Sequence, residues 1–411
     1  MAAAWRARMS VAPARAALRV VLVTIVALTA AVSGGPAHAD TGAFLWGVSS
    51  SGFQSEGSSP DSNWSRYAAS GRHEPVGTAV DFRHRYREDI ARAADLGVGV
   101  YRLSVEWARI QPEPERWDDT ELAYYDDVIA TIRGHGMTPM ITLDHWVYPG
   151  WIADRGGWAH PGTVDAWLAH ADTVAARYAG HGALWVTINE PSVYVWHEVS
   201  NGALSPGDAP MMFDRLVDAH RRAYETIHRY DPRAQVTSNA AYVPGAAPYL
   251  DTWFLDRVRD HLDFVGVDYY YGVAPGNLTA IRAATGEPAS VTPHPPGMYD
   301  ALMDYTRRFP GMPLYVVENG MATADGAPRP DGWTRSRHLR EHVDQMMRAV
   351  DDGAPVFGYN YWSITDNYEW GSYEPRFGLY SVDVRTDPAL LRRPTEGVET
   401  YRTIIAETRA G

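Results

Sequence analysis

The stretch LWVTINEP, residues Leu184–Pro191, places a short apolar run directly before a glutamate and a proline. Seven further runs share its character: they are short, apolar on both faces and rich in β-branched and aromatic residues. Such runs are typical of strands in a parallel sheet whose two faces are both buried. The eight runs are Phe44–Ser49, Val98–Val105, Met137–Leu143, Leu184–Asn189, Gln235–Ala240, Phe264–Tyr270, Pro313–Glu318 and Val356–Trp362.

Amphipathic stretches separate these runs, and they predict helices over Phe82–Leu96, Leu122–Arg133, Val164–Tyr178, Met212–Tyr230, Met298–Arg308, Arg335–Val350 and Val398–Thr408. Alternating strands and helices indicate an α/β fold, either a closed barrel or an open doubly wound sheet. No glycine-rich phosphate turn follows the first run, which ends Gly47-Val48-Ser49. Eight repeats in one unbroken segment therefore favour a single (β/α)8 TIM barrel over residues 40–411.

Composition excludes several functions. The 411 residues include 37 basic and 50 acidic ones, a formal charge of −13, which argues against nucleic acid and anionic membrane surfaces as partners. The chain has no cysteine, so a thiol nucleophile or a thiolate metal site is not possible. The motif HExxH is absent, and neither His145 nor His197 has a histidine four residues away. We therefore predict no metal and no cofactor.

The N-terminus has the pattern of an export signal. Arg6, Arg8, Arg15 and Arg19 precede the apolar run Val20–Val32, and Ala37-His38-Ala39 is a small-residue cleavage pattern. A membrane anchor is the alternative, but the run is short for a membrane span. We predict that residues 1–39 are a signal peptide, cleaved near Ala39-Asp40, and that the mature protein is secreted and not membrane-bound.

Polar and aromatic residues follow seven of the eight runs. The carboxyl ends of barrel strands lie on one face, which is where barrel enzymes build their active sites. We therefore expect these side chains to meet. They are Gln54 and Glu56, then Arg102, Ser104 and Glu106, then His145 and Trp146, then Asn189 and Glu190, then Asp268 to Tyr270, then Glu318 and Asn319, and finally Trp362, Asp366, Glu369 and Trp370.

Glu190 and Glu318 each end a buried strand, and paired carboxyls are what glycoside hydrolysis requires. One glutamate at a strand end is equally typical of a solvated rim or an ion pair, but two with Asn and Trp neighbours favour an active site. A buried Arg102 would favour the ionised form of a carboxylate beside it, and its structural alternative is a salt bridge inside the barrel.

The remaining candidates suit a sugar pocket. Trp362 and Trp370 offer flat apolar faces on which the C–H face of a sugar ring can stack. Gln54, His145, Asn189 and Glu369 can exchange hydrogen bonds with sugar hydroxyls. Tyr270 can donate to a nearby carboxylate, although a packed core tyrosine is its plain alternative.

The chain resembles glycoside hydrolase family 1, the β-glucosidase family, over nearly all of residues 44–385. The resemblance rests on seven motifs: FLWGVSSSGFQSEG (Phe44–Gly57), YRLSVEWARIQP (Tyr101–Pro112), ITLDHWVYPGW (Ile141–Trp151), WVTINEP (Trp185–Pro191), VVENG (Val316–Gly320), WSITDNYEW (Trp362–Trp370) and RFGLYSVD (Arg376–Asp383).

The resemblance implies a (β/α)8 barrel that retains anomeric configuration, with Glu190 as acid/base and Glu318 as nucleophile. It implies that Arg102 lies on the floor of the site and that Tyr270 contacts the nucleophile. The residues that it implies for glycone binding are Gln54, His145, Trp146, Asn189, Trp362, Glu369 and Trp370. Glu369 implies an unphosphorylated glycone, because family members acting on 6-phosphorylated sugars replace this carboxylate. The family usually has Asn where this chain has Asp268.

We therefore expect a retaining, exo-acting β-glycosidase that hydrolyses terminal β-D-glycosides, above all β-glucosides, through a covalent glycosyl-enzyme. The two carboxyl groups would then lie about 5–5.5 Å apart. The predicted partner is a small β-glycoside or an oligosaccharide. The alternatives are a transglycosidase using the same site, an endoglycanase of a related clan, and a sugar-binding homologue without catalysis.

Overall fold

Each of the eight apolar runs forms a parallel strand in the computed structural model, which describes residues 44–271 and 287–410. The predicted signal peptide, residues 1–39, and its cleavage site lie outside the described residues. Seven runs form one strand each: β1 (Leu45–Ser49), β2 (Val100–Ser104), β3 (Thr138–Asp144), β4 (Leu184–Ile188), β7 (Val265–Asp268), β8 (Leu314–Asn319) and β10 (Val356–Trp362).

The sheet closes on itself through the fifth run, which is divided at Ser238 into β5 (Gln235–Thr237) and β6 (Asn239–Ala241). The strand order is β5-β4-β3-β2-β1-β10-β8-β7-β6, so the two halves of this run are the two ends of the sheet. At the junction, Ser238 Oγ donates to the Ile188 carbonyl at 2.5 Å. The predicted (β/α)8 barrel is confirmed; the sequence pattern did not predict the break.

Burial on both faces explains the uniformly apolar strands. Val100, Met140, Val186 and Val317 belong to a small buried cluster in the barrel interior. The alternate strand residues, such as Tyr101, belong to the larger cluster that packs against the helices. Because successive side chains of a strand point to opposite faces, both layers need apolar residues.

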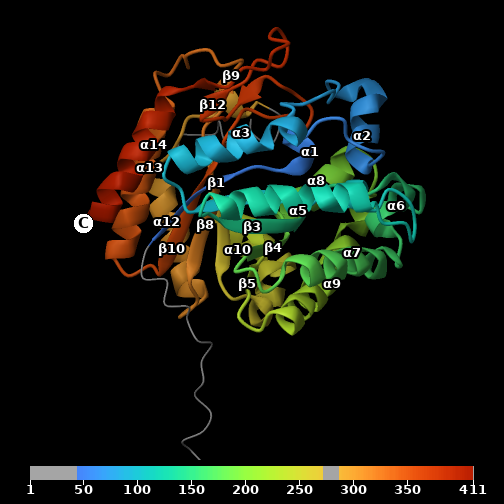
Figure 1. Cartoon of the computed structure of the whole chain (residues 1–411). Coiled ribbons are helices and arrows are strands. Elements are labelled where there is room, and N and C mark those ends of the chain that lie inside the picture. The colour runs from blue at the N-terminus through green and yellow to red at the C-terminus, as the bar shows by residue number, and fades with distance from the viewer. Residues whose placement is uncertain (1–43, 272–286, 411) are drawn as a thin grey trace, which may run out of the picture. The chain divides into compact units, whose positions relative to one another are not determined.

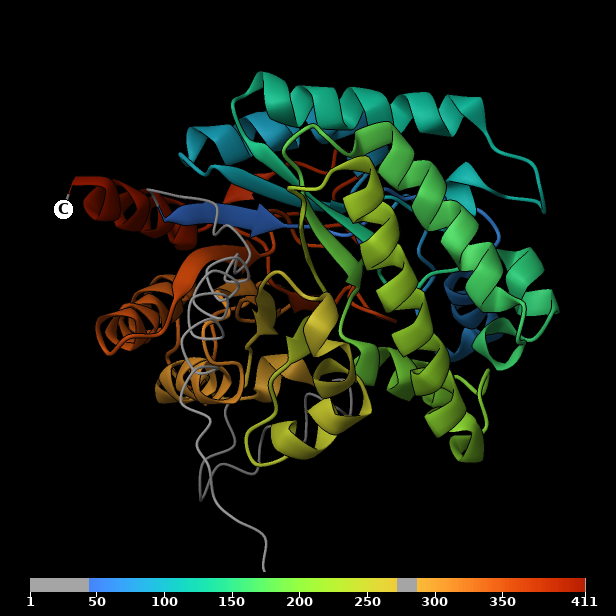
Figure 2. The same ribbon diagram turned by 90° about the horizontal axis from the view of Figure 1, so that it is seen from below.

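Helices surround the strands, as Figures 1 and 2 show. The seven predicted helices are confirmed, with ends shifted by a few residues, as α3 (Phe82–Asp95), α5 (Asp119–Gly134), α7 (Thr163–Tyr178), α9 (Ala209–Tyr230), α12 (Pro296–Arg308), α13 (Arg335–Asp351) and α14 (Glu396–Ala410). Caps account for some of the shifts. The Asp118 side chain accepts from the backbone N–H groups of Thr120 and Glu121, so α5 begins before its first apolar residue.

Shorter elements occupy the loops. Helical turns are α1 (Gly52–Ser55), α2 (Asn63–Tyr67), η1 (Ala68–Arg72), α4 (Trp107–Ile110), α6 (Gly150–Asp154), η2 (Gly157–Ala159), α8 (Pro191–Ser200), η3 (Pro206–Asp208), α10 (Ala247–Leu250), η4 (Asp251–Trp253), η5 (Leu255–His261) and η7 (Pro288–Ser290). Two small sheets pair β9 (Thr323–Ala324) with β11 (Pro375–Arg376) and β12 (Tyr380–Ser381) with β13 (Arg393–Pro394). Within the two described ranges, no helix has both the length and the hydropathy of a membrane span.

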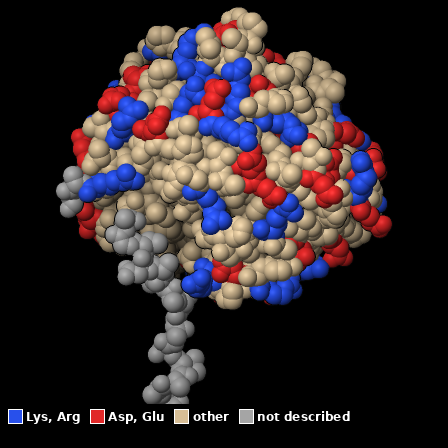
Figure 3. All heavy atoms as spheres, viewed as in Figure 1, with Lys and Arg blue, Asp and Glu red and all other residues tan. Residues whose placement is uncertain are grey.

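A buried ion pair ties α3 to the segment before α14. Arg392 donates to both carboxylate oxygens of Asp89, at 2.9 and 2.8 Å, and to the Val80 carbonyl at 2.6 Å. Both side chains of the pair are 0% exposed. On the face seen in Figure 3, by contrast, basic and acidic side chains are interspersed on the surface. Solvent screens such surface pairs, whereas the buried pair depends on both partners being present.

We predict that Asp89→Ala lowers the free energy of unfolding by about 3–5 kcal/mol, because it leaves the Arg392 guanidinium buried without its anion. Urea unfolding followed by tryptophan fluorescence measures the change. The matched control is Glu407→Ala, which removes a surface pair with Arg340 whose side chains are 60% and 44% exposed. It should cost less than about 1 kcal/mol. Equal losses in the two variants would contradict the prediction.

Candidate active site

The Glu318 carboxylate lies at the mouth of the barrel, one residue before the end of β8, and is held from two sides. Arg102, fully buried on β2, donates from Nη1 to Glu318 Oε1, and the Tyr270 hydroxyl donates to Oε2 at 2.6 Å. The other guanidinium nitrogens are also used, since Nη2 donates to Asn189 Oδ1 at 2.6 Å and Nε to Thr142 Oγ1 at 3.0 Å. Glu318 is therefore fixed in orientation and paired with a cation.

Glu190 follows β4 and is the residue that precedes α8. Its backbone is left-handed, with φ 38°, and its N–H donates to the Asn239 carbonyl at 3.1 Å. Glu190 is 7% exposed. Burial raises the pKa of its carboxyl well above the ordinary value, the negative charge of Glu318 raises it further, and Arg102 opposes both effects. The site thus combines a carboxyl whose protonated form is favoured by its surroundings with a carboxylate paired to arginine.

A third carboxyl, Asp268, lies beside these two. It ends β7, where its Cα is paired with that of Glu318 on β8. Burial, followed by the charges of Glu318 and Glu190, raises the pKa of Asp268 well above its usual range. Asn239 Nδ2 donates both to Asp268 and to Asn189 Oδ1, the latter at 2.7 Å. Asn239 was absent from the sequence candidates, yet it lies on the fifth run, and the strand-end rule used for the other seven runs would have found it.

Gln54 and Glu369 meet on another side of the mouth. Gln54 Nε2 lies 3.4 Å from Glu369 Oε2 and donates to Asn367 Oδ1 at 3.1 Å. Burial, followed by the charge of Glu318, raises the pKa of Glu369 to about 8, although hydrogen bonds from Trp362 and Gln54 lower it. Glu369 can therefore accept a hydrogen bond when ionised and donate one when protonated.

His145 supplies a neutral imidazole to the same mouth. Burial, together with the positive charge of Arg102, lowers the pKa of His145 well below its usual value. Asn189 Nδ2 lies 3.3 Å from His145 Nε2 and can donate to it. The buried Nδ1 has no hydrogen-bond partner among the described residues. This nitrogen is a candidate contact for a polar ligand group.

Three tryptophans lie at the same mouth. The His145 ring is stacked on Trp362, with centroids 5.8 Å apart, and on Trp370, at 5.7 Å. Trp146 contacts Trp370 at 4.5 Å, and its indole N–H donates to the Asn189 carbonyl at 2.7 Å. Trp146 thus braces the turn that carries Glu190, a role that the sequence did not predict. All eleven predicted site residues lie at this mouth.

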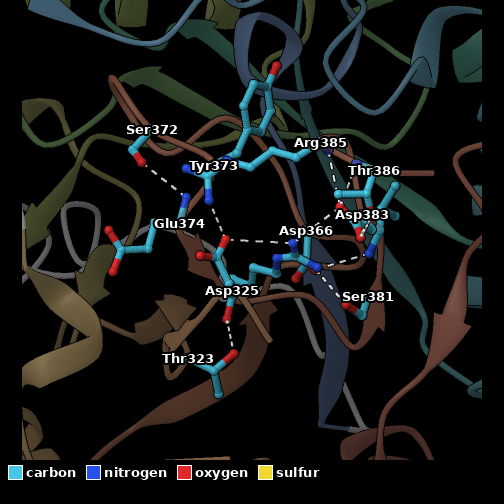
Figure 4. Close-up of polar contacts among 12 residues, drawn as sticks. Thr323, Asp325, Asp366, Ser372, Tyr373, Glu374, Ser381, Asp383, Arg385 and Thr386 are labelled. Atoms are coloured by element: carbon cyan, nitrogen blue, oxygen red, sulfur yellow. Dashed lines mark hydrogen bonds and ion pairs between the residues drawn. The ribbon is translucent and has the colours of Figure 1, made fainter. Parts of the chain in front are cut away.

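The loop that carries Glu369 and Trp370 is fastened by Asp366. This buried carboxylate accepts from the Gly378 N–H at 2.8 Å, the Ser381 hydroxyl at 2.9 Å and the Val382 N–H at 3.0 Å. Figure 4 shows Asp366 and Ser381 close to Asp383 and Asp325. Arg376 Nη2 lies 3.5 Å from Asp383 and 3.7 Å from Asp325. Polar contacts thus hold both ends of the loop.

Within residues 44–271 and 287–410, no group of three His, Asp or Glu side chains has an arrangement that could hold a metal ion.

Comparisons with known proteins agree with this geometry. The family model described as glycosyl hydrolase family 1 matches residues 41–253 and 241–410. β-Glucosidase A of Thermotoga maritima is 27% identical, over 85% of this chain and 94% of that protein. Thermostable β-glucosidase B of Thermobispora bispora is 28% identical, over 88% and 89%. The solved structure of the Thermotoga maritima β-glucosidase in complex with castanospermine superposes with a TM-score of 0.76 and 26% identity, over 89% of this chain and 98% of that one.

We predict that Asp366→Ala loosens the loop, because three donors lose one shared acceptor. The free energy of unfolding should fall by roughly 2–4 kcal/mol, and amide hydrogen exchange should speed up in residues 363–382. Glu374→Ala is the control, since Glu374 is an exposed carboxylate of the same loop and should change stability by less than about 0.5 kcal/mol. Unchanged exchange in Asp366→Ala would refute the role of this carboxylate.

Proposed function

Because the chain belongs to glycosyl hydrolase family 1 and is therefore a glycoside hydrolase acting on O-glycosyl bonds, we propose that it is a retaining, exo-acting β-glycosidase. The proposal rests on one observation: two buried carboxyls at one barrel mouth have opposite environments. Glu318 is paired with Arg102, whereas burial and the charge of Glu318 raise the pKa of Glu190. When the surroundings of two carboxyls favour the ionised form of one and the protonated form of the other, the first can act as nucleophile and the second as acid.

The first step uses both groups. The Glu318 carboxylate attacks the anomeric carbon while Glu190 gives its proton to the glycosidic oxygen, and the bond to the aglycone breaks. The hydrogen bonds from Arg102 and Tyr270 hold the attacking carboxylate in a single orientation, which lowers the entropy lost on reaching the transition state. The product of this step is a glycosyl ester of Glu318.

The second step reverses the roles. Glu190, now a carboxylate, takes a proton from a water molecule as the oxygen of that water attacks the anomeric carbon, and the bond to Glu318 breaks. Formation of the ester removes the charge of Glu318, which favours an ionised Glu190 at the stage at which a base is required. Two successive displacements at one carbon retain its configuration.

The proposed glycone is an unphosphorylated β-D-glucosyl residue or a close epimer. Glu369, Gln54, His145 and Asn189 form the polar wall, and Trp362 offers a ring face. With a pKa raised to about 8, Glu369 is ionised in part near that pH, and its ionised form would repel a phosphate group. The names of the relatives, β-glucosidases A and B, support a glucoside.

The expected result for the wild type is release of nitrophenol from 4-nitrophenyl β-D-glucoside, with much slower release from its 6-phosphate. Glu318→Ala should lower turnover by a factor on the order of 10⁴ or more. Glu190→Ala should lose about 10²–10⁴-fold on glucosides with poor leaving groups. Glu407→Ala is the control and should keep wild-type rates.

Azide separates the two roles. With 2,4-dinitrophenyl β-D-glucoside and azide, Glu318→Ala should give the α-glucosyl azide, because azide replaces the nucleophile in one displacement. Glu190→Ala should give the β-glucosyl azide, since azide then attacks the ester of Glu318. The reverse pattern, or wild-type turnover in Glu318→Ala, would refute the assignment. Release of free monosaccharide from cellobiose would indicate exo action. The amount of alkyl glucoside formed when an alcohol is added measures how often the glucosyl group is transferred to the alcohol instead of to water.

We also propose that the protein is exported, on the pattern of residues 1–39 alone. The expected N-terminal sequence of protein recovered from culture medium begins at Asp40. Recovery of the activity only inside cells, with residues 1–39 still attached, would contradict export.

A further inference from the structure

We propose that Asp268 is a positioning residue, kept as a neutral carboxylic acid, whose proton is hydrogen-bonded to the Glu190 carboxyl. The inference rests on the proposed function, because it concerns how Glu190 gives and receives a proton. Both residues bond to Asn239, whose side-chain amide donates to Asp268 and whose carbonyl accepts from the Glu190 N–H at 3.1 Å. The two carboxyls lie within hydrogen-bonding reach of each other, yet two ionised carboxylates have no hydrogen to share. One of the two must carry the proton.

The surroundings of Asp268 indicate which carboxyl donates. Asp268 Oδ2 accepts from Asn239, whereas the buried Oδ1 accepts from no residue that the structure describes. Since Asn239 occupies Oδ2, Oδ1 is the oxygen left to carry a proton toward Glu190.

Charge balance supports the same state. The groups that face Asp268 are Glu190 from the turn after β4, Glu318 from β8, Arg102 from β2, Tyr270 from the end of its own strand, and the amide of Asn239 from β6. With Asp268 and Glu190 protonated, Arg102 and the Glu318 carboxylate cancel. After the proton leaves Glu190 and Glu318 becomes an ester, Arg102 and the Glu190 carboxylate cancel. An ionised Asp268 would add an unpaired buried charge at both stages.

A neutral acid at this position has a defined use. When Glu190 loses its proton to the glycosidic oxygen, the carboxylate that remains gains a hydrogen bond from Asp268 that strengthens as charge develops. The proton of Asp268 stays on Asp268 throughout. A carboxylic acid held neutral by a buried site can act as such a donor near pH 7.

Two substitutions test this arrangement through the alkaline limb of the kcat/KM profile, which should stay in place in one variant and move in the other. Asp268→Asn keeps a neutral donor, so the limb for cellobiose should stay in place and kcat/KM should remain within about threefold of wild type. Asp268→Ala removes the donor from Glu190. Its limb should rise by about one pH unit, and kcat/KM for cellobiose should fall about 10- to 100-fold.

The leaving group separates this role from general damage to the site. 2,4-Dinitrophenyl β-D-glucoside needs no proton on departure, so its kcat/KM should fall less than about threefold in Asp268→Ala. Glu198→Gln is the matched control. Glu198 is a buried carboxyl on α8, and burial is the main cause that raises its pKa to about 7. Its hydrogen bonds come from Tyr67, Tyr148 and Asn63, and not from the residues around Asp268. The alkaline limb of this variant should not move.

An ionised Asp268 predicts a different pH profile. If Asp268 is ionised, both substitutions remove a negative charge beside Glu190, and both limbs move to lower pH. That result, or equal loss on the two substrates, would overturn the inference. If Asp268→Ala does not fold, the limb of Asp268→Asn alone decides between no shift and a downward shift. A wild type that cleaves neither substrate would instead overturn the proposed function.

Discussion

The ion pair between Arg102 and Glu318 is the interaction around which the rest of the site is arranged. Arg102 is buried on β2 and donates to a hydroxyl on β3, a carboxylate on β8 and the side-chain amide oxygen of the residue that follows β4. A buried guanidinium requires an anion, and a carboxylate in the same place requires a cation. Each charge therefore lowers the free-energy cost of burying the other. The further carboxyls nearby, Glu190 and Asp268, meet an already balanced pair, and burial favours their protonated forms.

Strained backbone marks the same region. Trp146, Glu190 and Trp370 all have left-handed backbones, with φ of 70°, 38° and 43°. Such conformations cost about 1–3 kcal/mol each and persist where the surroundings hold them. The indole bond from Trp146 to the Asn189 carbonyl and the aromatic contact between Trp146 and Trp370 supply that support. The stability of the barrel thus offsets a geometry that these turns would not adopt alone.

The barrel explains how residues so distant in sequence meet. Parallel strands all present their carboxyl ends at one rim, so Arg102 and Glu318, 216 residues apart, come into contact. The loop after β10 extends this rim over the site, and Asp366 and the ion pairs of Arg376 fasten it. Trp370 is thereby held beside His145 and Trp146, which follow β3, and Glu369 beside Gln54, which follows β1.

The sequence by itself determined the eight strands, the seven main helices and the positions of Glu190 and Glu318, because these follow from local periodicity and from motifs at strand ends. It did not determine the break at Ser238, the part played by Asn239 or the bracing role of Trp146, since hydrogen bonds between distant strands create them. Only the tertiary structure decided which charges and how much burial surround each carboxyl. Desolvation and Coulomb interactions depend on burial and on distance through space, and neither can be read along the chain.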